Sequence, residues 1–175
     1  MKYGYFSQVK ILLLSLPIVF LLALPLSANM NGLYTKATID DRGQLHIKTK
    51  DQREILPKKY KDQVSFDKPL IAEDRTTIGW LALYPNCCTS YPIPLKLVIS
   101  RDGKILRTFQ VNSLPLWNWH FEGNDKQVAF AQETVHGHIG VHFELRDIRS
   151  GRLIAYYDGD PTPNAPKWVH DVANL

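Results

Sequence analysis

Short runs of apolar and β-favouring residues recur along most of this chain and are separated by polar, turn-forming residues. Such runs, bounded by turn signals, are typical of strands. The pattern predicts strands at 45–49, 78–84, 95–100, 105–111, 127–131, 141–145 and 153–157. Regular short strands of this kind indicate an all-β domain.

The segments between these runs contain turn signals in which glycine follows or accompanies a polar residue. They lie at 40–43, 101–104, 122–125 and 149–152, and each contains a glycine. Glycine adopts the positive φ that tight hairpin turns need. The predicted strands are therefore expected to pair with their neighbours as antiparallel hairpins.

The last stretch of the chain has a helical pattern instead. Asn164 is a suitable capping residue, and Pro166 fits the first turn of a helix. Trp168, Val172 and Leu175 then fall on one face. We expect one short helix at about 164–175 that packs on the sheet.

The N-terminal segment has the order of regions found in a secretory signal peptide. Lys2 and Lys10 precede a charge-free apolar run at 11–26, and small residues close it at Ser27 and Ala28. We expect cleavage after Ala28, which leaves residues 29–175 as a single exported domain, periplasmic or secreted. The alternative is an uncleaved membrane anchor, for which the run is short and contains Pro17 and Pro25.

Charge gives no argument for nucleic acid as a partner. The formal net charge of +4 falls to +2 without the first 28 residues, because these carry Lys2 and Lys10 and no acidic residue. Affinity for nucleic acid rests on a strongly basic surface. After signal cleavage no membrane contact is expected either.

A faint internal repeat relates two parts of the domain. TTIGWLALY at 76–84 parallels KQVAFAQET at 126–134, and the hairpin glycines Gly103 and Gly151 have a similar spacing. A repeat of about 50 residues with about four strands per unit is the spacing of propeller blades. The units would span about 69–111 and 117–158, and residues 33–60 would supply a degenerate third.

Two segments resemble known proteins. FEGNDKQVAFAQ at 121–132, followed by HFELRDIRSGRLIAYY at 142–157, resembles a blade of WD40-like, TolB-type β-propeller repeats. GWLALYPNCCTSYPIPLKLVI at 79–99 resembles small exported bacterial proteins of uncharacterised function. The resemblance implies a scaffold and no particular chemistry. A closed propeller needs about four blades, so we expect an antiparallel meander of blade-like four-stranded units, as an open or partial propeller or a sandwich.

Cys87 and Cys88 are the chain's two cysteines and are adjacent. In an oxidising compartment they can form a vicinal disulfide that stiffens the turn. The open alternatives are free thiols, a bridge to another molecule, or a redox or metal role. The repeat aligns this loop with His136 and His138, and two thiolates with two imidazoles would suit zinc or copper. Otherwise no cofactor is expected, and the histidines are ordinary loop residues.

Several aromatic residues are candidates for a ligand pocket. Trp117 and Trp119 alternate with polar residues, so both indoles are expected on one face of a strand. Together with Trp80, Tyr84 and Tyr91 they could line a pocket for a sugar or a peptide. The alternative is that these large side chains are core residues.

These observations favour a non-enzymatic binding or interaction module of the cell envelope, with a protein or small ligand as its partner. One alternative is a metal-binding or redox-linked protein that uses Cys87, Cys88 and the loop His136–His142. The other is an enzyme with an unrecognised site. Gly-x-Ser-x-Gly and His-Glu-x-x-His motifs do not occur in the sequence.

Overall fold

The computed structural model of the chain describes residues 33–110, 114–136 and 140–175, together with Met1. Within these residues the elements are β1 (Tyr34–Ile39), β2 (Leu45–Thr49), β3 (Glu54–Ile55), β4 (Ser65–Ile71), β5 (Thr77–Tyr84), β6 (Ile93–Arg101), β7 (Lys104–Gln110), β8 (Leu116–Glu122), β9 (Gln127–Gln132), β10 (His142–Asp147), β11 (Leu153–Asp158) and α1 (Lys167–Ala173). Apart from Met1, the expected signal peptide lies outside the described residues. Of the helices in this part of the chain, none is long and apolar enough to cross a membrane.

The strands form three antiparallel sheets, each a meander in chain order. The first sheet is β1–β2–β3, the second is β4–β5–β6–β7, and the third has the order β8–β9–β10–β11. The hairpin turns β1–β2, β6–β7, β8–β9 and β10–β11 fall at the expected signals, and Gly43, Gly103, Gly123 and Gly151 have positive φ there. The all-β fold with one C-terminal helix is confirmed, and sheets of three or four strands are consistent with blade-like units.

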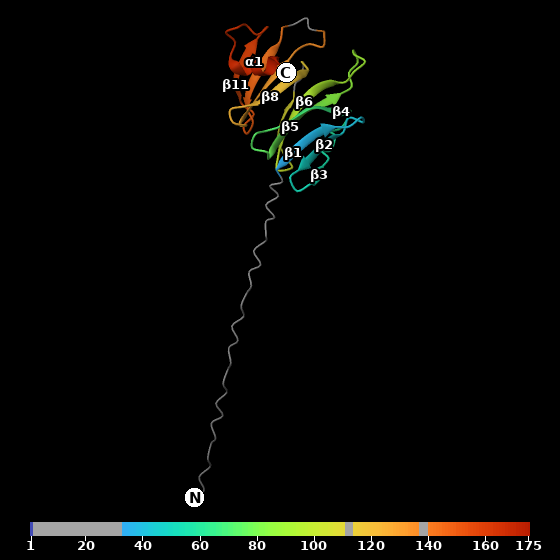
Figure 1. Cartoon of the computed structure of the whole chain (residues 1–175), viewed down its shortest axis with the longest axis vertical. Helices are drawn as coiled ribbons and strands as arrows, with labels where there is room; N and C mark the ends of the chain where they lie inside the picture. The colour runs from blue at the N-terminus through green and yellow to red at the C-terminus, as the bar shows by residue number, and fades with distance from the viewer. Residues whose placement is uncertain (2–32, 111–113, 137–139) are drawn as a thin grey trace.

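The sheets stack face to face, with the second sheet in the middle and α1 on the far side of the third (Figure 1). Strand β5 shows how the chain builds this arrangement. Ile78, Trp80 and Ala82 pack toward the first sheet, whereas Leu81 packs toward the third. Successive side chains of a strand point to opposite faces, so one apolar strand can serve two cores.

The contact between the second and third sheets is centred on Trp119, which is only 1% exposed. Its ring lies against Gly79, where a Cβ atom would stand 2.7 Å from Ile99 Cδ1 and closer still to Trp119 Cη2. A side chain at position 79 would therefore hold the two sheets apart. Trp119 also packs edge-on against Phe121, with ring centroids 5.0 Å apart.

An irregularity in β4 gives the indole nitrogen of Trp119 its partner. The register of β4 against β5 shifts between Asp67 and Leu70, and Lys68 has a φ of 44°. At this bulge the carbonyl of Lys68 accepts a hydrogen bond of 3.0 Å from Trp119 Nε1. A buried indole N–H without an acceptor would cost about 1–3 kcal/mol, so the bulge makes the burial of Trp119 favourable.

The helix differs from the expectation in its ends and its buried face. Pro166 is the N-cap and makes no side-chain capping bond, so Asn164 does not cap the helix. Val169 and Val172 are buried against the third sheet, with Trp168 packed beside them. Leu175 is 58% exposed and lies beyond the helix end, so its predicted contact with the sheet is wrong.

We expect Gly79→Ala to destabilise the protein by about 1–3 kcal/mol, the usual cost of forcing an extra carbon into a packed core. The added methyl group would displace Trp119 from the second sheet. Urea unfolding followed by tryptophan fluorescence measures this change. Gly140→Ala is the matched control, because its Cβ would meet only Gly159 at an ordinary 3.4 Å. Equal unfolding midpoints for the two variants would contradict the account.

Candidate functional site

A cavity of about 420 Å³ opens between the first and second sheets. Its inner wall comes from Tyr34 on β1, Ile47 on β2 and Trp80 on β5. The chain between β3 and β4, at 56–60, forms its outer wall, and residues of the β6–β7 hairpin complete it. Cavities of this size with mainly apolar walls and few polar groups are typical of small-molecule sites.

The cavity has one unusual polar feature, the indole nitrogen of Trp80. Trp80 is 2% exposed, and no described residue accepts a hydrogen bond from its Nε1. The ring itself is held by Phe66, which packs edge-on at 6.2 Å between centroids. An unpaired buried donor is costly, and an acceptor oxygen that reached the indole nitrogen would remove that cost.

Two hydroxyl groups of the cavity are engaged in hydrogen bonds. Tyr34 Oη accepts a hydrogen bond of 2.8 Å from the Gly103 amide. Burial raises the pKa of Tyr34, although the bond from Gly103 opposes this shift, so Tyr34 stays neutral. Ser100 Oγ donates to the Lys104 carbonyl at 3.0 Å. The Trp80 N–H, by contrast, has no partner among the described residues.

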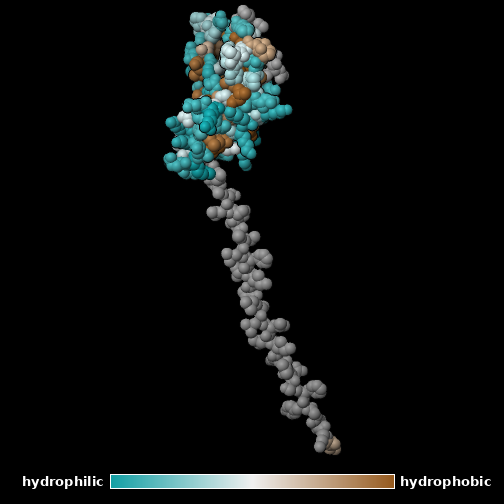
Figure 2. Space-filling model, turned by 90° about the vertical axis from the view of Figure 1, so that its right-hand side faces the viewer, coloured by the Kyte–Doolittle hydropathy of each residue, from teal (hydrophilic) through white to brown (hydrophobic). Residues whose placement is uncertain are grey.

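The mouth of the cavity combines exposed apolar side chains with lysines. Leu56 is 52% exposed and Ile105 is 54% exposed, and both line the cavity. Lys58 and Lys59 lie beside Leu56. Figure 2 shows that one side of the molecule is mainly hydrophilic, with hydrophobic residues in small separate patches. An apolar ligand with an acceptor group, neutral or anionic, would match this mouth.

The structure does not bring the five candidate aromatic residues together. Trp80 and Tyr84 lie in the core between the first and second sheets, and Trp119 lies in the core between the second and third. Tyr91 is 49% exposed in the β5–β6 loop. Trp117 donates from Nε1 to the Glu133 carbonyl at 3.1 Å. Of these residues, Trp80 lines the cavity.

The expected alignment of Trp117 with Trp119 fails at a bulge. The register of β8 against β9 shifts between Leu116 and Asn118. As a result Leu116 and Trp119, three residues apart, share one core that does not include Trp117. The sequence did not point to the other cavity residues, among them Tyr34, Leu56 and Tyr60. Tyr34 begins a strand that the apolar pattern did not reveal.

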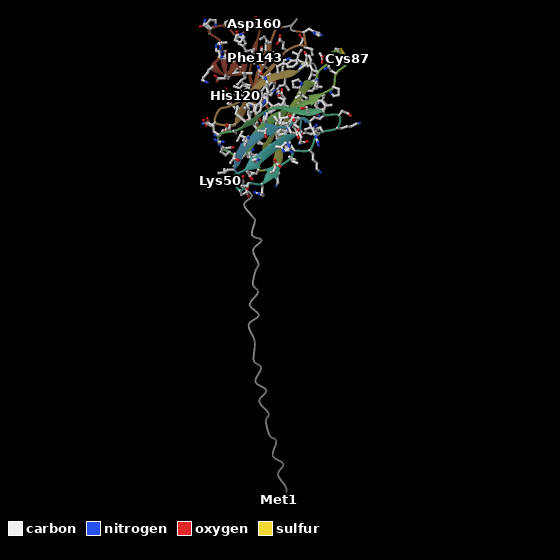
Figure 3. The ribbon with its side chains drawn as sticks, turned by 45° about the vertical axis from the view of Figure 1, so that its right-hand side comes forward. Met1, Lys50, Cys87, His120, Phe143 and Asp160 are labelled. Carbon is white, nitrogen blue, oxygen red and sulfur yellow. A yellow bond between two sulfur atoms is a disulfide. The ribbon has the colours of Figure 1, made fainter. Side chains whose placement is uncertain are left out.

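Cys87 and Cys88 lie at disulfide distance in an exposed loop between β5 and β6. Figure 3 shows Cys87 at the periphery of the molecule. Asn86 orders this loop, because its Oδ1 accepts hydrogen bonds from the amides of Cys88 at 2.8 Å and Thr89 at 2.9 Å. The adjacent pair expected from the sequence is therefore present, on a loop that its own side chains also hold.

Strands β5 and β9, which lead into the cysteine loop and the histidine loop, start close to each other. The Asp74 amide, before β5, donates a hydrogen bond of 3.0 Å to Asp125 Oδ2, before β9. His138 is outside the described residues, which contain no group of three or more metal-ligating side chains. A zinc or copper site with Cys87, Cys88, His136 and His138 stays a prediction.

His142, which begins β10, is bonded at both ring nitrogens. Nδ1 contacts Asp158 at 2.5 Å and Nε2 contacts Glu144 at 3.2 Å. Burial alone would lower the pKa of His142, but the hydrogen bonds to Asp158 and Glu144 outweigh it and raise the pKa. Each ring nitrogen faces a different carboxylate, an arrangement that favours the protonated ring.

In comparisons with known proteins, no family model matches the chain, and no curated protein matches it in sequence. The candidate site therefore rests on its geometry.

The raised pKa of His142 predicts that the free energy of unfolding falls with rising pH. Protonation is favoured in the folded state, so this contribution is complete below the ordinary pKa of 6.5 and is lost as pH rises through the higher folded value. Its size is below about 1 kcal/mol, because the pair is partly exposed. Thermal unfolding at pH 6 and pH 8.5 should show a smaller pH effect in His142→Gln. An unchanged pH effect in that variant would sink this assignment.

Proposed function

We propose that the protein is an exported, non-enzymatic binding module of the cell envelope. It holds a small, largely apolar ligand in the cavity between the first and second sheets. The observation that carries the proposal is the Trp80 indole, which is buried, lines the cavity and has no acceptor among the described residues. The ligand we propose carries a carbonyl, ether or carboxylate oxygen that accepts this hydrogen bond.

The cavity walls favour binding over catalysis. Among the described residues that line it, the side chains are aromatic, aliphatic, hydroxyl or lysine, without a carboxylate or an imidazole. Such walls bind by burial of apolar area, at about 25 cal/mol per Å². The Trp80 donor then adds orientation, because a ligand without an acceptor would leave the N–H unpaired.

The scaffold supports the same proposal. We infer that the three sheets are open relatives of WD40-like, TolB-type blades, stacked without closing into a ring. In this arrangement β5 contributes to two cores, and the cavity forms where the short first sheet covers the second incompletely. Blade-type scaffolds carry no common chemistry, which agrees with a function in recognition.

The proposal that the protein is exported depends on its first 28 residues. We expect the chain that accumulates outside the cytoplasm to begin at or near Asn29, because Ala28 closes the apolar run. N-terminal sequencing of the protein recovered from the envelope or the medium measures this. Recovery of uncleaved, soluble protein from the cytosol would contradict export. It would leave the proposal of a ligand in the cavity unaffected.

Fluorine NMR of protein labelled with 5-fluorotryptophan tests the ligand site. The chain has four tryptophans, and Trp80→Phe identifies the Trp80 signal. With a panel of small aromatic ketones, acids and ethers as probes, we expect the Trp80 resonance to shift on binding. The signal of Trp168, which belongs to α1 and packs against the third sheet, should stay unchanged.

The variant Trp80→Phe, used with matched probes, separates the contribution of the hydrogen bond from that of apolar burial. Trp80→Phe removes the donor but keeps an aromatic ring, so it should weaken acceptor-bearing probes by about tenfold or less, as expected for one hydrogen bond. Matched hydrocarbons should bind both proteins equally. If no probe moves the Trp80 signal, or if hydrocarbons and acceptors are affected alike, the proposed role of the indole is wrong.

A further inference from the structure

A second cavity, of about 450 Å³, lies along the edge of the middle sheet. Four successive residues of β7, Arg107 to Gln110, line it, and it is closed on the other side by Gln132, Glu144 and Arg146 of the third sheet. Side chains of a strand alternate between its two faces. A cavity that touches four residues in a row therefore runs along the strand edge, where the main chain itself is accessible.

The main chain of β7 is available at that edge. In the described part of the chain β7 pairs with β6 alone, and it ends the order β4–β5–β6–β7. An edge strand presents a row of unpaired N–H and C=O groups. Four residues extend over about 13 Å, which is enough for a short added strand.

The floor of this cleft contains a polar side chain without a partner. Gln132 is 7% exposed, yet its side-chain amide has no hydrogen bond to any described residue. A side-chain amide offers both donors and an acceptor, which is also what a peptide group needs. The side-chain amide of Gln132 lines the cleft and is not among the groups sealed from solvent, so a polar ligand in the cleft can reach it.

The charges along the cleft favour an acidic ligand. Arg107 lies on one wall and is fixed by donating from Nε to the Ile148 carbonyl at 3.1 Å. Arg146 lies on the other, bonded to Glu144 and, from Nη1, to the Gly151 carbonyl at 3.0 Å. Glu144 pairs with Arg146, so these three side chains together keep one net positive charge. Each guanidinium has five N–H donors and keeps some of them for a carboxylate.

The aromatic residues of the cleft do not suit a sugar as its ligand. Phe109 and Phe130 pack on each other, and they are only 7% and 1% exposed. A sugar would need the open face of a ring. The exposed apolar side chains lie instead on β11, where Ile154 and Tyr156 are 39% and 63% exposed and Tyr156 pairs with Glu144 across the strands. They suit the alternate side chains of a strand.

We propose that this cleft binds an extended acidic segment of a partner protein. The segment pairs with β7 as a fifth strand of the middle sheet, a recognised mode of peptide binding. Main-chain hydrogen bonds to β7 supply the affinity. Gln132 bonds a peptide group of the segment. The net positive charge of the cleft, to which Arg146 contributes, selects an acidic side chain. This surface is separate from the Trp80 cavity, so the two proposals stand or fall independently.

The test selects peptides from a displayed library of random nine-residue sequences, with the full chain, purified in the form that accumulates, as bait. We expect enriched peptides to alternate β-branched or aromatic residues with an acidic residue. In ¹⁵N NMR spectra these peptides should shift the amides of 107–110. N-methylation at alternate peptide residues should weaken binding by tenfold or more, because it removes main-chain donors.

Two variants test the roles of Gln132 and Arg146 in peptide binding, and a third serves as a control. Gln132→Leu and Arg146→Gln should each weaken the selected peptides at least threefold, and Arg146→Gln should also remove the preference for acid. Arg42→Gln, an exposed change in the β1–β2 turn, should have no effect. Arg146→Gln keeps the test open if Gln132→Leu fails to fold, which the ¹⁵N spectrum reveals.

Three outcomes would overturn the proposal. The first is that no peptide is enriched over selection against Arg146→Gln. The second is that enriched peptides shift amides around Trp80 and leave β7 unchanged. The third is that the protein itself dimerises through β7, detected by light scattering as a monomer–dimer equilibrium that the peptides do not disrupt. In that case the occupant is a second copy of this chain.

Discussion

The close approach of Trp119 to Gly79 is the constraint on which the rest of the structure depends. The two four-stranded sheets can share a core only where the middle strand lacks a side chain, and Gly79 supplies that position. The bulge at Lys68 then gives the indole its acceptor. With the middle sheet fixed in this way, its other face is free to carry Trp80 against the first sheet. The cavity therefore follows from an alternation of glycine and tryptophan on β5.

Much of the fold could be predicted from the sequence because the hairpins depend on local chemistry. Glycines at positive φ form the hairpin turns, and the apolar run within Gln127–Gln132 is visible without the structure. Strand β4 is different, since it contains Pro69 and a residue with positive φ at Lys68. A proline normally argues against a strand interior, and here the bulge accommodates it. Its tertiary role, bonding Trp119, has no local signal.

The candidate site was harder to predict for the same reason. Trp80 and Trp119 look equivalent in sequence, but one lines a cavity and the other closes a core, and the difference depends on which sheet lies opposite. The bulge in β8 also changes which residues share a face. The rule that every second residue of a strand faces the same side therefore does not hold between Trp117 and Trp119. Gln132 carries no sequence signal at all, because the absence of its partner is a property of the folded cleft. By contrast, the adjacent pair Cys87–Cys88 needed only covalent geometry.

Hydrogen exchange of the tryptophan indole N–H groups tests the central claim most directly. Trp119 Nε1 is buried and bonded to the Lys68 carbonyl between two sheets, so we expect it to exchange only through global unfolding, with the same free energy as the core amides. Trp80 lines the cavity and its Nε1 has no acceptor among the described residues, so this N–H should exchange faster, through local opening. Exchange of Trp119 that is as fast as that of Trp80 would contradict the interlocked middle sheet.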